Sequence, residues 1–243
     1  MTHYFNKATR KCYCKSNIPK HLNELDRSLF QDLINIVFKP QYSHDETNNE
    51  TYVIALPFPE TKNIKKFNFK TTSALKAVII HKDVEEIEAG AFYFGFDLSV
   101  VSIPYGVTNI YDHAFYECPS LTYINFPESL KEIGKCAFKA CDSLRNINLP
   151  QSIEYIGDSA FSKCISLKSV IIPDSLTRIN CDTFAYCLEL KVVSIPKSVT
   201  FIGNGAFKGC KKLSSISLPS KFKLTVRSIL DRIDISKIEI NYI

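Results

Sequence analysis

Apolar residues recur every 23 positions from residue 75 onward, always in the same order. Most repeats carry a leucine, two aliphatic residues, a proline, a phenylalanine and a cysteine at fixed places. The recurring phenylalanines are Phe92, Phe115, Phe138, Phe161, Phe184 and Phe207. A fixed period of about 20 to 50 residues is the signature of repeat architectures. The sequence therefore predicts a solenoid of stacked 23-residue layers.

The repeat that begins at Leu144 shows how each layer is expected to fold. Ile147 and Leu149 alternate with polar residues, which predicts a short strand with one buried side. Pro150 ends this strand, because proline cannot donate a hydrogen bond to a ladder. A later position in the repeat holds Gly134, Gly157, Asn180 and Gly203. This choice of residues predicts a backbone with positive φ at that position.

The first 74 residues do not keep the period and are expected to form an N-terminal cap. Residues 22–38, between Pro19 and Pro40, place apolar side chains at the spacing of one helical face. We therefore predict a helical cap over residues 1–74 that ends in a degenerate repeat, because the end of a stack otherwise exposes its core. The solenoid is predicted over residues 75–243, with a last strand near residues 234–242.

The phrase from Ile147 to Phe161, followed by Cys164 and Leu167, resembles the BspA-like leucine-rich repeats, also called the Treponema pallidum type. The resemblance extends over residues 75–220 and is specific, because many positions recur in register. It implies a curved solenoid with a parallel sheet on the concave face, and protein recognition without catalysis. With the helical cap, the expected fold class is an α+β repeat. Members of the family include bacterial surface adhesins and large sets of proteins in parasitic protists.

The composition fits one elongated folded domain, with 45% hydrophobic residues and a net charge of +5 among 243 residues. This charge is too small and too scattered to indicate nucleic-acid binding. No apolar run follows the first residues, and no stretch approaches the roughly 20 apolar residues that span a bilayer. The sequence predicts a cytoplasmic location, with nuclear access left open, and no membrane insertion.

Residues that alternate with the buried strand positions are expected to face out on the concave side and to contact a protein partner. The predicted contact residues are Val100, Tyr123, Asn125, Asn146, Asn148, Ser169, Ile171 and Val192. Exposed apolar and aromatic groups in this position suit a protein or peptide. The alternative is that β-branched residues stand there only because they form good strands.

A basic stripe is predicted next to these contact residues. Arg145, Lys168 and Lys191 share one repeat position and would stack on neighbouring layers. Such a stripe would guide an acidic partner. The alternative is a solvated edge that discourages pairing between sheets.

The segment from Lys197 to Phe201 resembles the docking motif that regulatory subunits present to protein phosphatase 1. The match is Lys197, Val199 and Phe201, which correspond to its basic, valine and phenylalanine positions. A motif of this kind adds an extended strand to a sheet and places two apolar side chains in pockets. Against it, Val199 stands at a core position of the repeat and is expected to be buried, whereas Phe201 is expected to be exposed.

Residues that would support catalysis or cofactor binding are not arranged in any recognisable pattern. Cys12, Cys14, His3 and His21 could supply four metal ligands, but a single residue between the cysteines is weak spacing for zinc. Nine cysteines are present, five of them at the repeat position, and buried free thiols are preferred to disulfides there. We predict no metal, no cofactor and no enzymatic activity.

The function predicted from the sequence is a non-catalytic protein-binding module. Its preferred form is an intracellular adaptor or regulatory subunit, with protein phosphatase 1 as a candidate partner. The alternative is a microbial surface adhesin that binds a host extracellular protein. Oligomers through the end strands are a further expectation.

Overall fold

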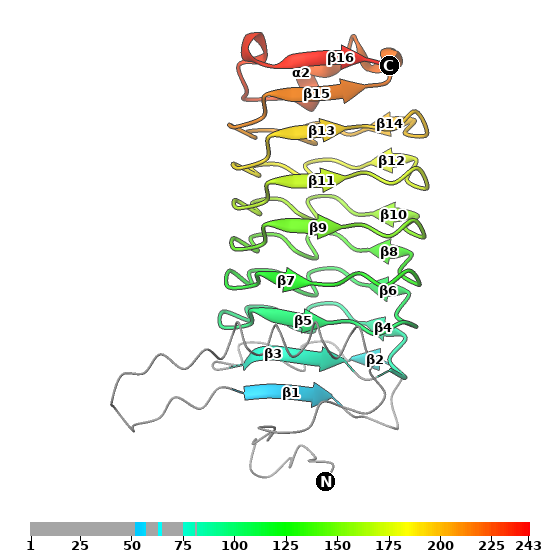
Figure 1. Cartoon of the computed structure of the whole chain (residues 1–243), viewed down its shortest axis with the longest axis vertical. Coiled ribbons are helices and arrows are strands. Elements are labelled where there is room, and N and C mark those ends of the chain that lie inside the picture. Colours follow the sequence, from blue (N-terminus) through cyan, green and yellow to red (C-terminus); the bar gives the residue numbers. More distant parts are fainter. Residues whose placement is uncertain (1–51, 57–62, 65–74, 81) are drawn as a thin grey trace, which may run out of the picture.

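A computed structural model describes residues 52–56, 63–64, 75–80 and 82–243, with side chains from Asn63 onward. Figure 1 shows the described layers rising one above another in a single column. The helix predicted at residues 22–38 lies outside the described residues, as do the four metal-ligand candidates Cys12, Cys14, His3 and His21.

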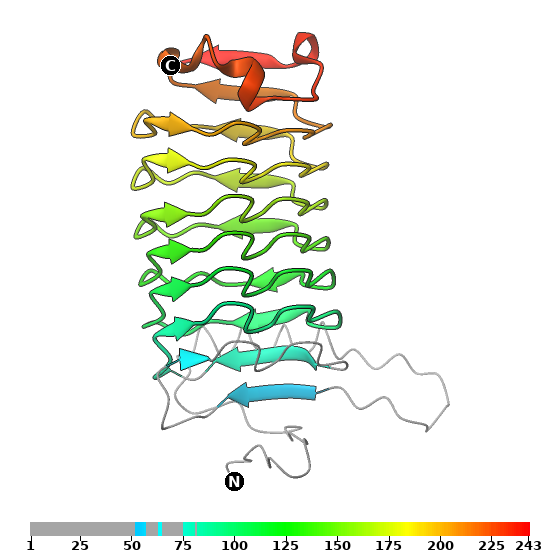
Figure 2. The same cartoon turned by 180° about the vertical axis from the view of Figure 1, so that it is seen from behind.

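The layers contribute one strand each to the main face of the column, and the layers up to β14 also contribute a two-residue strand to a second face behind it (Figures 1 and 2). The main face contains β1 (Tyr52–Leu56), β3 (Leu75–Ile80), β5 (Val100–Ser102), β7 (Tyr123–Ile124), β9 (Asn146–Asn148), β11 (Ser169–Ile171), β13 (Val192–Ser194), β15 (Ser215–Leu218) and β16 (Glu239–Tyr242). The second face contains β2 (Asn63–Ile64), β4 (Glu86–Ile87), β6 (Asn109–Ile110), β8 (Glu132–Ile133), β10 (Tyr155–Ile156), β12 (Arg178–Ile179) and β14 (Phe201–Ile202).

Neighbouring strands on both faces pair in parallel, and between β3 and β15 the register equals the 23-residue repeat, whereas β15 and β16 pair at an offset of one residue more, with Ser215 opposite Glu239. Val170 pairs with Val193 on the main face, and Ile110 pairs with Ile133 on the second face. The ladder is interrupted once on each face, between β7 and β9 on the main face and between β10 and β12 on the second. The predicted leucine-rich-repeat solenoid with parallel strands and 23-residue layers is confirmed.

The core between the two faces is a continuous stack of phenylalanine rings. All six repeat phenylalanines are fully buried. Successive rings lie nearly parallel, with centroids 4.9 Å apart between Phe92 and Phe115 and 5.6 Å apart between Phe161 and Phe184. These separations approach the spacing of about 4.8 Å between strands. From Phe92 to Phe207 the rings therefore stack close to the spacing of the strands.

The repeat cysteines are free, buried thiols that join each layer to the one before it. The Sγ of Cys141 donates to the carbonyl oxygen of Phe115 at 3.2 Å, and Cys164 donates to Phe138 at 3.2 Å. Burial raises the pKa of Cys164 to about 12, because the thiolate would have no water around it. The preference for buried free thiols is confirmed for these residues.

The glycine position predicted to need positive φ does not have it. Gly134, Gly157 and Gly203 are absent from the positive-φ residues of the structure. Glycine is needed here because two backbones approach closely. A Cβ on Gly157 would lie 2.5 Å from the backbone nitrogen of Lys135 in the preceding layer. At the same position the side-chain amide of Asn180 donates to the carbonyl oxygen of Ile156 at 2.6 Å. The second face is interrupted at this layer.

Positive φ falls instead on two turn positions that repeat every 23 residues. One column contains Gly90, His113, Cys136, Ser159, Asp182 and Gly205, and the other contains Phe94, Glu117, Ala140, Lys163, Tyr186, Gly209 and Arg232. Most of these residues are not glycine, so nothing in the choice of residues revealed the conformation. Hydrogen bonds from the next layer hold it, as when the nitrogen of Ala140 donates to the carbonyl of Ser162 at 2.9 Å.

Helix is minimal in the described residues, so the predicted α+β class and helical N-terminal cap are not supported. The described helical elements are α2 (Val226–Ile229), η1 (Ser220–Phe222) and η2 (Ile235–Lys237), which all belong to the C-terminal layer. That layer covers the end of the core with Phe222, Ile229 and Leu230, all buried. The last strand, predicted near 234–242, is β16. The boundary at residue 74 stays a prediction.

Replacing Ala140 by glycine is expected to raise the free energy of unfolding by about 1 kcal/mol. Ala140 holds φ at 61°, a conformation that costs roughly 1–2 kcal/mol for a residue with a Cβ. Urea denaturation measures the change. The control is Gly209→Ala in the same column, where the new Cβ would lie 2.7 Å from the Tyr186 ring and should destabilise the fold. An Ala140→Gly protein that unfolds more readily would contradict the account.

Candidate functional site

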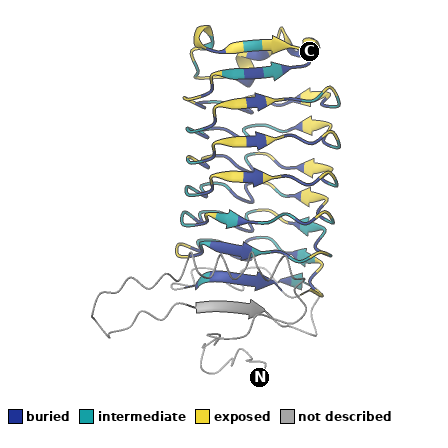
Figure 3. Cartoon of the chain, in the orientation of Figure 1, coloured by how far each residue is buried: buried dark blue, intermediate teal, exposed yellow. Residues whose placement is uncertain are grey.

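The main face exposes its outward side chains over β9, β11 and β13. Figure 3 shows these strands in the exposed colour, whereas β3 and β5 are mostly buried. We call this region the exposed face, and its residues are Asn146, Asn148, Ser169, Ile171, Val192 and Ser194. Ile171 is 71% exposed and Val192 is 56% exposed. Two β-branched apolar side chains thus stand in water on neighbouring strands.

Ile171 and Val192 are diagonal neighbours in the parallel ladder. Val192 pairs with Ser169, and Ile171 pairs with Ser194. The surrounding side chains are small and polar, so the two apolar side chains project beyond their neighbours. Their main chains are held by ladder bonds on both sides, and Val170 and Val193 anchor them to the core. The arrangement is a rigid apolar contact point framed by hydrogen-bonding groups.

Val100, predicted as a contact residue, is only 2% exposed, and this prediction is wrong. The neighbouring outward positions Ala77 and Ile79 are 3% and 4% exposed. Alternation along a strand identifies the side of the sheet to which a residue points. It does not identify what lies over that side. The solvent-exposed part of the main face therefore begins beyond β5.

Asn125 is on the predicted side of the sheet, but its side-chain amide is hydrogen-bonded to the backbone of Ile103. Its Oδ1 accepts from the nitrogen of Ile103 at 2.7 Å, and its Nδ2 donates to the carbonyl of Ile103 at 2.7 Å. The following Phe126 packs edge-on against Phe138 at 5.5 Å. The main face is interrupted directly after this layer. Tyr123, one position before β7 ends, is half-buried.

The predicted basic stripe is present and solvent-exposed along one border of the exposed face. Arg145, Lys168 and Lys191 lie immediately before the strands, and the nitrogen of Lys168 donates to the carbonyl of Arg145 at 2.9 Å. Glu189 nearby pairs with Lys212 at 2.7 Å. The pKa of Glu189 is lowered, first by the hydrogen bond from Lys212 and also by Lys191 and Lys168.

Charge is divided unevenly along the column. Residues 75–130 contain eight carboxylates and two lysines, whereas residues 131–243 contain ten carboxylates and seventeen lysines and arginines. The first layers are therefore acidic and the later layers basic. The exposed face and its stripe belong to the basic part, so its electrostatic potential favours an acidic partner.

The docking motif predicted for protein phosphatase 1 is part of the solenoid and is not available. Val199 is fully buried in the core. Ser198 and Thr200 donate their hydroxyls to the carbonyls of Leu176 and Thr177 in the preceding layer. Phe201 belongs to β14 and lies under the Arg178 guanidinium, 4.0 Å from its ring centroid. Lys197 is exposed, but the motif cannot leave the sheet without unfolding its layer.

The second face carries exposed aromatic side chains that are not among the contact residues predicted from the sequence. Tyr155 and Phe201 are 45% and 37% exposed, with Arg178 between them. The repeat did indicate these side chains, because Asn109, Glu132, Tyr155, Arg178 and Phe201 share one position. Burial raises the pKa of Tyr155, and the carboxylate of Asp158 adds to the effect.

Features typical of small-molecule or metal sites are lacking in the described part of the chain. No group of three or more histidine, cysteine or acidic side chains there could hold a metal ion. Asp112 and Asp158 accept hydrogen bonds from the backbone nitrogens of Lys135 and Cys181 in the next layer. No described helix has the length and apolar character needed to cross a bilayer.

A hollow of about 330 Å³ lies at the C-terminal turns and is polar and shallow. Its lining includes Asp182, Asn204, Lys208, Arg227 and Asp231. Lys208 and Asp231 pair with each other at 3.0 Å across it. Ligand pockets are mostly apolar with few polar groups, so this hollow does not resemble one.

The family model described as a BspA type leucine-rich repeat region in six copies matches residues 62–191 and 177–242. The chain belongs to the BspA-type leucine-rich repeat family. No curated protein matches it.

Solved structures of BspA-type and related repeat proteins resemble the chain. A Treponema pallidum leucine-rich repeat protein is 30% identical, with a TM-score of 0.65, over 75% of this chain and 85% of that one. A Bacteroides ovatus leucine-rich repeat protein is 25% identical, with a TM-score of 0.55, over 78% of this chain and 59% of that one. The chain thus spans most of the first protein and a smaller part of the second.

The predicted cytoplasmic or nuclear location is contradicted by the chain's membership of the BspA-type family. A protein of Faecalibacterium prausnitzii in the same set is named a leucine-rich cell surface protein; it is 24% identical, with a TM-score of 0.47, over 78% of this chain and 59% of that one. The prediction rested on the lack of an apolar run near Met1. That lack carries no conclusion about where a BspA-type protein works.

Replacing Asn125 by alanine is expected to lower the free energy of unfolding by about 1–3 kcal/mol, because the backbone nitrogen and carbonyl of Ile103 lose their partner. The matched variant is Asn148→Ala on the exposed face, where a change within about 0.5 kcal/mol is expected. Thermal or urea unfolding of the two proteins measures the difference. Equal effects would show that Asn125 has no special structural role.

Proposed function

We propose that this BspA-type chain is a non-catalytic module that binds a protein partner on its exposed face. The observation that carries the proposal is the exposure of Ile171 and Val192, at 71% and 56%, on a rigid sheet. The core is already closed behind them by Val170 and Val193, so neither side chain is needed outside for packing. Exposed apolar groups in a fixed frame suit contact with another macromolecule.

The chemistry around these two residues is that of a protein interface. Protein interfaces combine an apolar centre with a polar rim that forms hydrogen bonds. Here the rim consists of Asn146, Asn148 and Ser169, with short side chains that lose little freedom on binding. The rigid ladder also reduces the entropy cost of association, because the surface is already in its bound form.

The partner is proposed to be acidic near its contact point. Arg145, Lys168 and Lys191 border the exposed face and belong to the basic part of the column. Rim charges of this kind accelerate encounter and select a partner of opposite sign more than they add affinity. Tyr123 lies at the acidic end of the same face and would extend the contact only for a long partner.

We further propose that the chain acts at a microbial surface and binds an extracellular protein of a host. Membership of the BspA-type family supports this choice over the intracellular adaptor. The protein-binding face requires no cofactor, since its contacts are side chains and backbone already in place.

Binding is expected to depend on the two exposed apolar residues. The double variant Ile171→Ser, Val192→Ser should lose about tenfold or more in affinity for its extracellular partner, because the contact centre carries most of the binding energy. Surface plasmon resonance against a panel of purified host extracellular-matrix proteins measures this. The control is Tyr155→Ser on the second face, which should bind like the parent chain. A double variant with unchanged affinity would refute the assignment of the face.

Exposure on the cell is expected as well. In intact cells of the source organism, added protease should remove the protein while a cytoplasmic marker stays whole. The measurement is immunoblotting before and after protease treatment, with lysed cells as the control. Digestion only after lysis would contradict the surface proposal. It would not bear on the proposal that the exposed face binds a protein, which the binding assay tests.

A further inference from the structure

The C-terminal end of the column leaves one edge of a strand unpaired. β16 pairs in parallel with β15, and Figures 1 and 2 show no further strand beyond it among the described elements. The nitrogens of Glu239 and Ile243 donate to carbonyls of Ser214 and Leu218, both at 2.9 Å. Successive residues of a strand point their backbone groups to opposite edges. Ile240 and Tyr242 therefore turn their N–H and C=O groups to the open edge.

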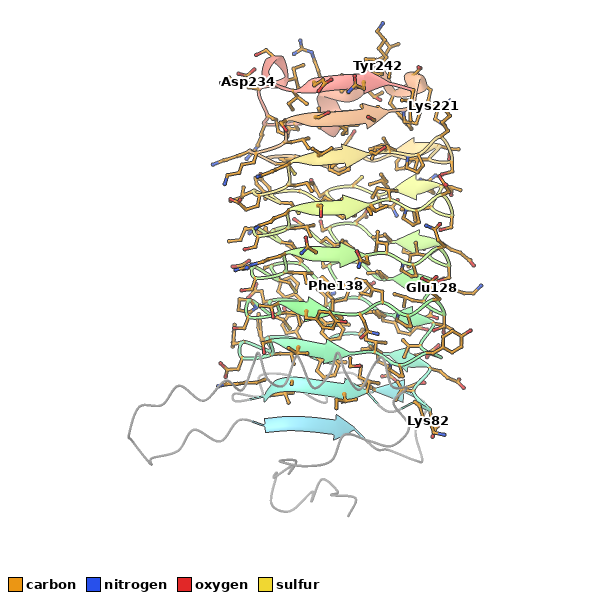
Figure 4. All side chains as sticks on the ribbon, viewed as in Figure 1. Lys82, Glu128, Phe138, Lys221, Asp234 and Tyr242 are labelled. Carbon is orange, nitrogen blue, oxygen red and sulfur yellow. The ribbon has the colours of Figure 1, made fainter. Side chains whose placement is uncertain are left out.

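The side chains at this edge are apolar and incompletely covered. Ile240 and Tyr242 stand in register with Ile216 and Leu218, so they lie on the core side of the sheet. Both would be enclosed by another layer. Tyr242 is 37% exposed and Ile240 is half-buried. Figure 4 shows Tyr242 at the upper end of the column.

Two further apolar side chains of the C-terminal layer are exposed. Ile243 is 45% exposed and Leu224 is 97% exposed. Ser220 donates its nitrogen to the carbonyl of Ile243 at 3.1 Å. The Lys223 ammonium lies 5.8 Å from the Tyr242 ring centroid. Ser220 and Lys223 thus lie beside the end of β16.

We propose that β16 binds β16 of a second copy of this chain, antiparallel, around a two-fold axis at Asn241. Ile240 then faces Tyr242 of the second copy, and the reverse pair forms on the other side of the axis. Each pair exchanges two backbone hydrogen bonds, so the edges are joined by four. The surface is complementary to itself, as a two-fold interface requires.

The side chains agree with this register. An aromatic residue opposite a β-branched one is a favourable cross-strand pair, and both Ile240–Tyr242 pairs are of this type. Asn241 faces Asn241 of the second copy, and Glu239 faces Ile243. No like charges stand directly opposite each other on the paired strands. β16 also lacks the proline and the inward-pointing charge that protect many edge strands from pairing.

The charge of the column separates this arrangement from a head-to-tail one. Residues 219–243 contain five lysines and arginines and three carboxylates, so end-to-end contact brings two basic ends together. Added salt screens their repulsion and should strengthen the dimer. Head-to-tail contact would place the basic end against the acidic layers of residues 75–130, and salt would weaken it. It would also give open filaments and not a closed pair.

Sedimentation velocity over a range of protein and salt concentrations tests the proposal. The parent chain is expected to form dimers whose dissociation constant falls as salt rises from about 0.05 to 0.5 M. Tyr242→Pro removes an N–H that points away from β15, and should weaken the dimer tenfold or more. Tyr242→Phe should dimerise like the parent. Melting curves of both variants check that the column is folded.

A cross-linking experiment locates the axis independently of those affinities. Residues 241 of the two copies form a pair without mutual hydrogen bonds, with Cα atoms about 4.5 Å apart, which is within the range of a disulfide. Asn241→Cys should therefore give a disulfide-linked dimer with oxidised glutathione, and Glu239→Cys should not. The parent chain, which already has nine cysteines, sets the background. A monomeric parent, a dimer weakened by salt, or equal linkage by both variants would overturn the proposal.

Discussion

The structure depends on one constraint: every layer must repeat the contacts of the layer before it at the spacing of a parallel ladder. Strands in a sheet lie about 4.8 Å apart, and stacked rings such as Phe115 and Phe138 reach 5.1 Å between centroids. Thiols and hydroxyls add bonds between layers, as when Ser152 donates to the carbonyl of Leu130 at 2.7 Å. A layer alone could not bury its phenylalanine, so each is stable only between neighbours.

This constraint separates the residues that hold the fold from those that are free to act. The side chains of the leucine, phenylalanine and cysteine columns are buried against neighbouring layers, so they cannot contact a partner. Function is confined to positions between them, where the ladder fixes the main chain and leaves the side chain unconstrained. Ile171 and Val192 are the clearest case, since their exposure contributes nothing to the core. A rigid frame with variable outward residues is well suited to recognition.

The two interruptions of the ladders coincide with departures from the repeat. Phe126 stands where other layers hold isoleucine or leucine, and its ring turns edge-on to Phe138 beside the break between β7 and β9. Asn180 stands where neighbouring layers hold glycine, and its amide replaces a backbone donor at the break between β10 and β12. The exposed face begins just past the first break. A substitution at one repeat position therefore coincides with a local break in strand pairing.

The amino-acid pattern alone was enough to predict the layers, their register and the buried columns, because residues 23 positions apart meet across the stack. It also indicated the exposure of Ile171 and Val192 and the burial of Val199, since alternation fixes the side of a strand. The three-dimensional arrangement was needed to find that Val100 is buried, that Asn125 bonds to the backbone of Ile103, and that the glycines allow close approach of two backbones and do not have positive φ. These features depend on what lies over a face, how a side chain turns and how near two backbones come. A linear pattern of residue types carries none of those distances.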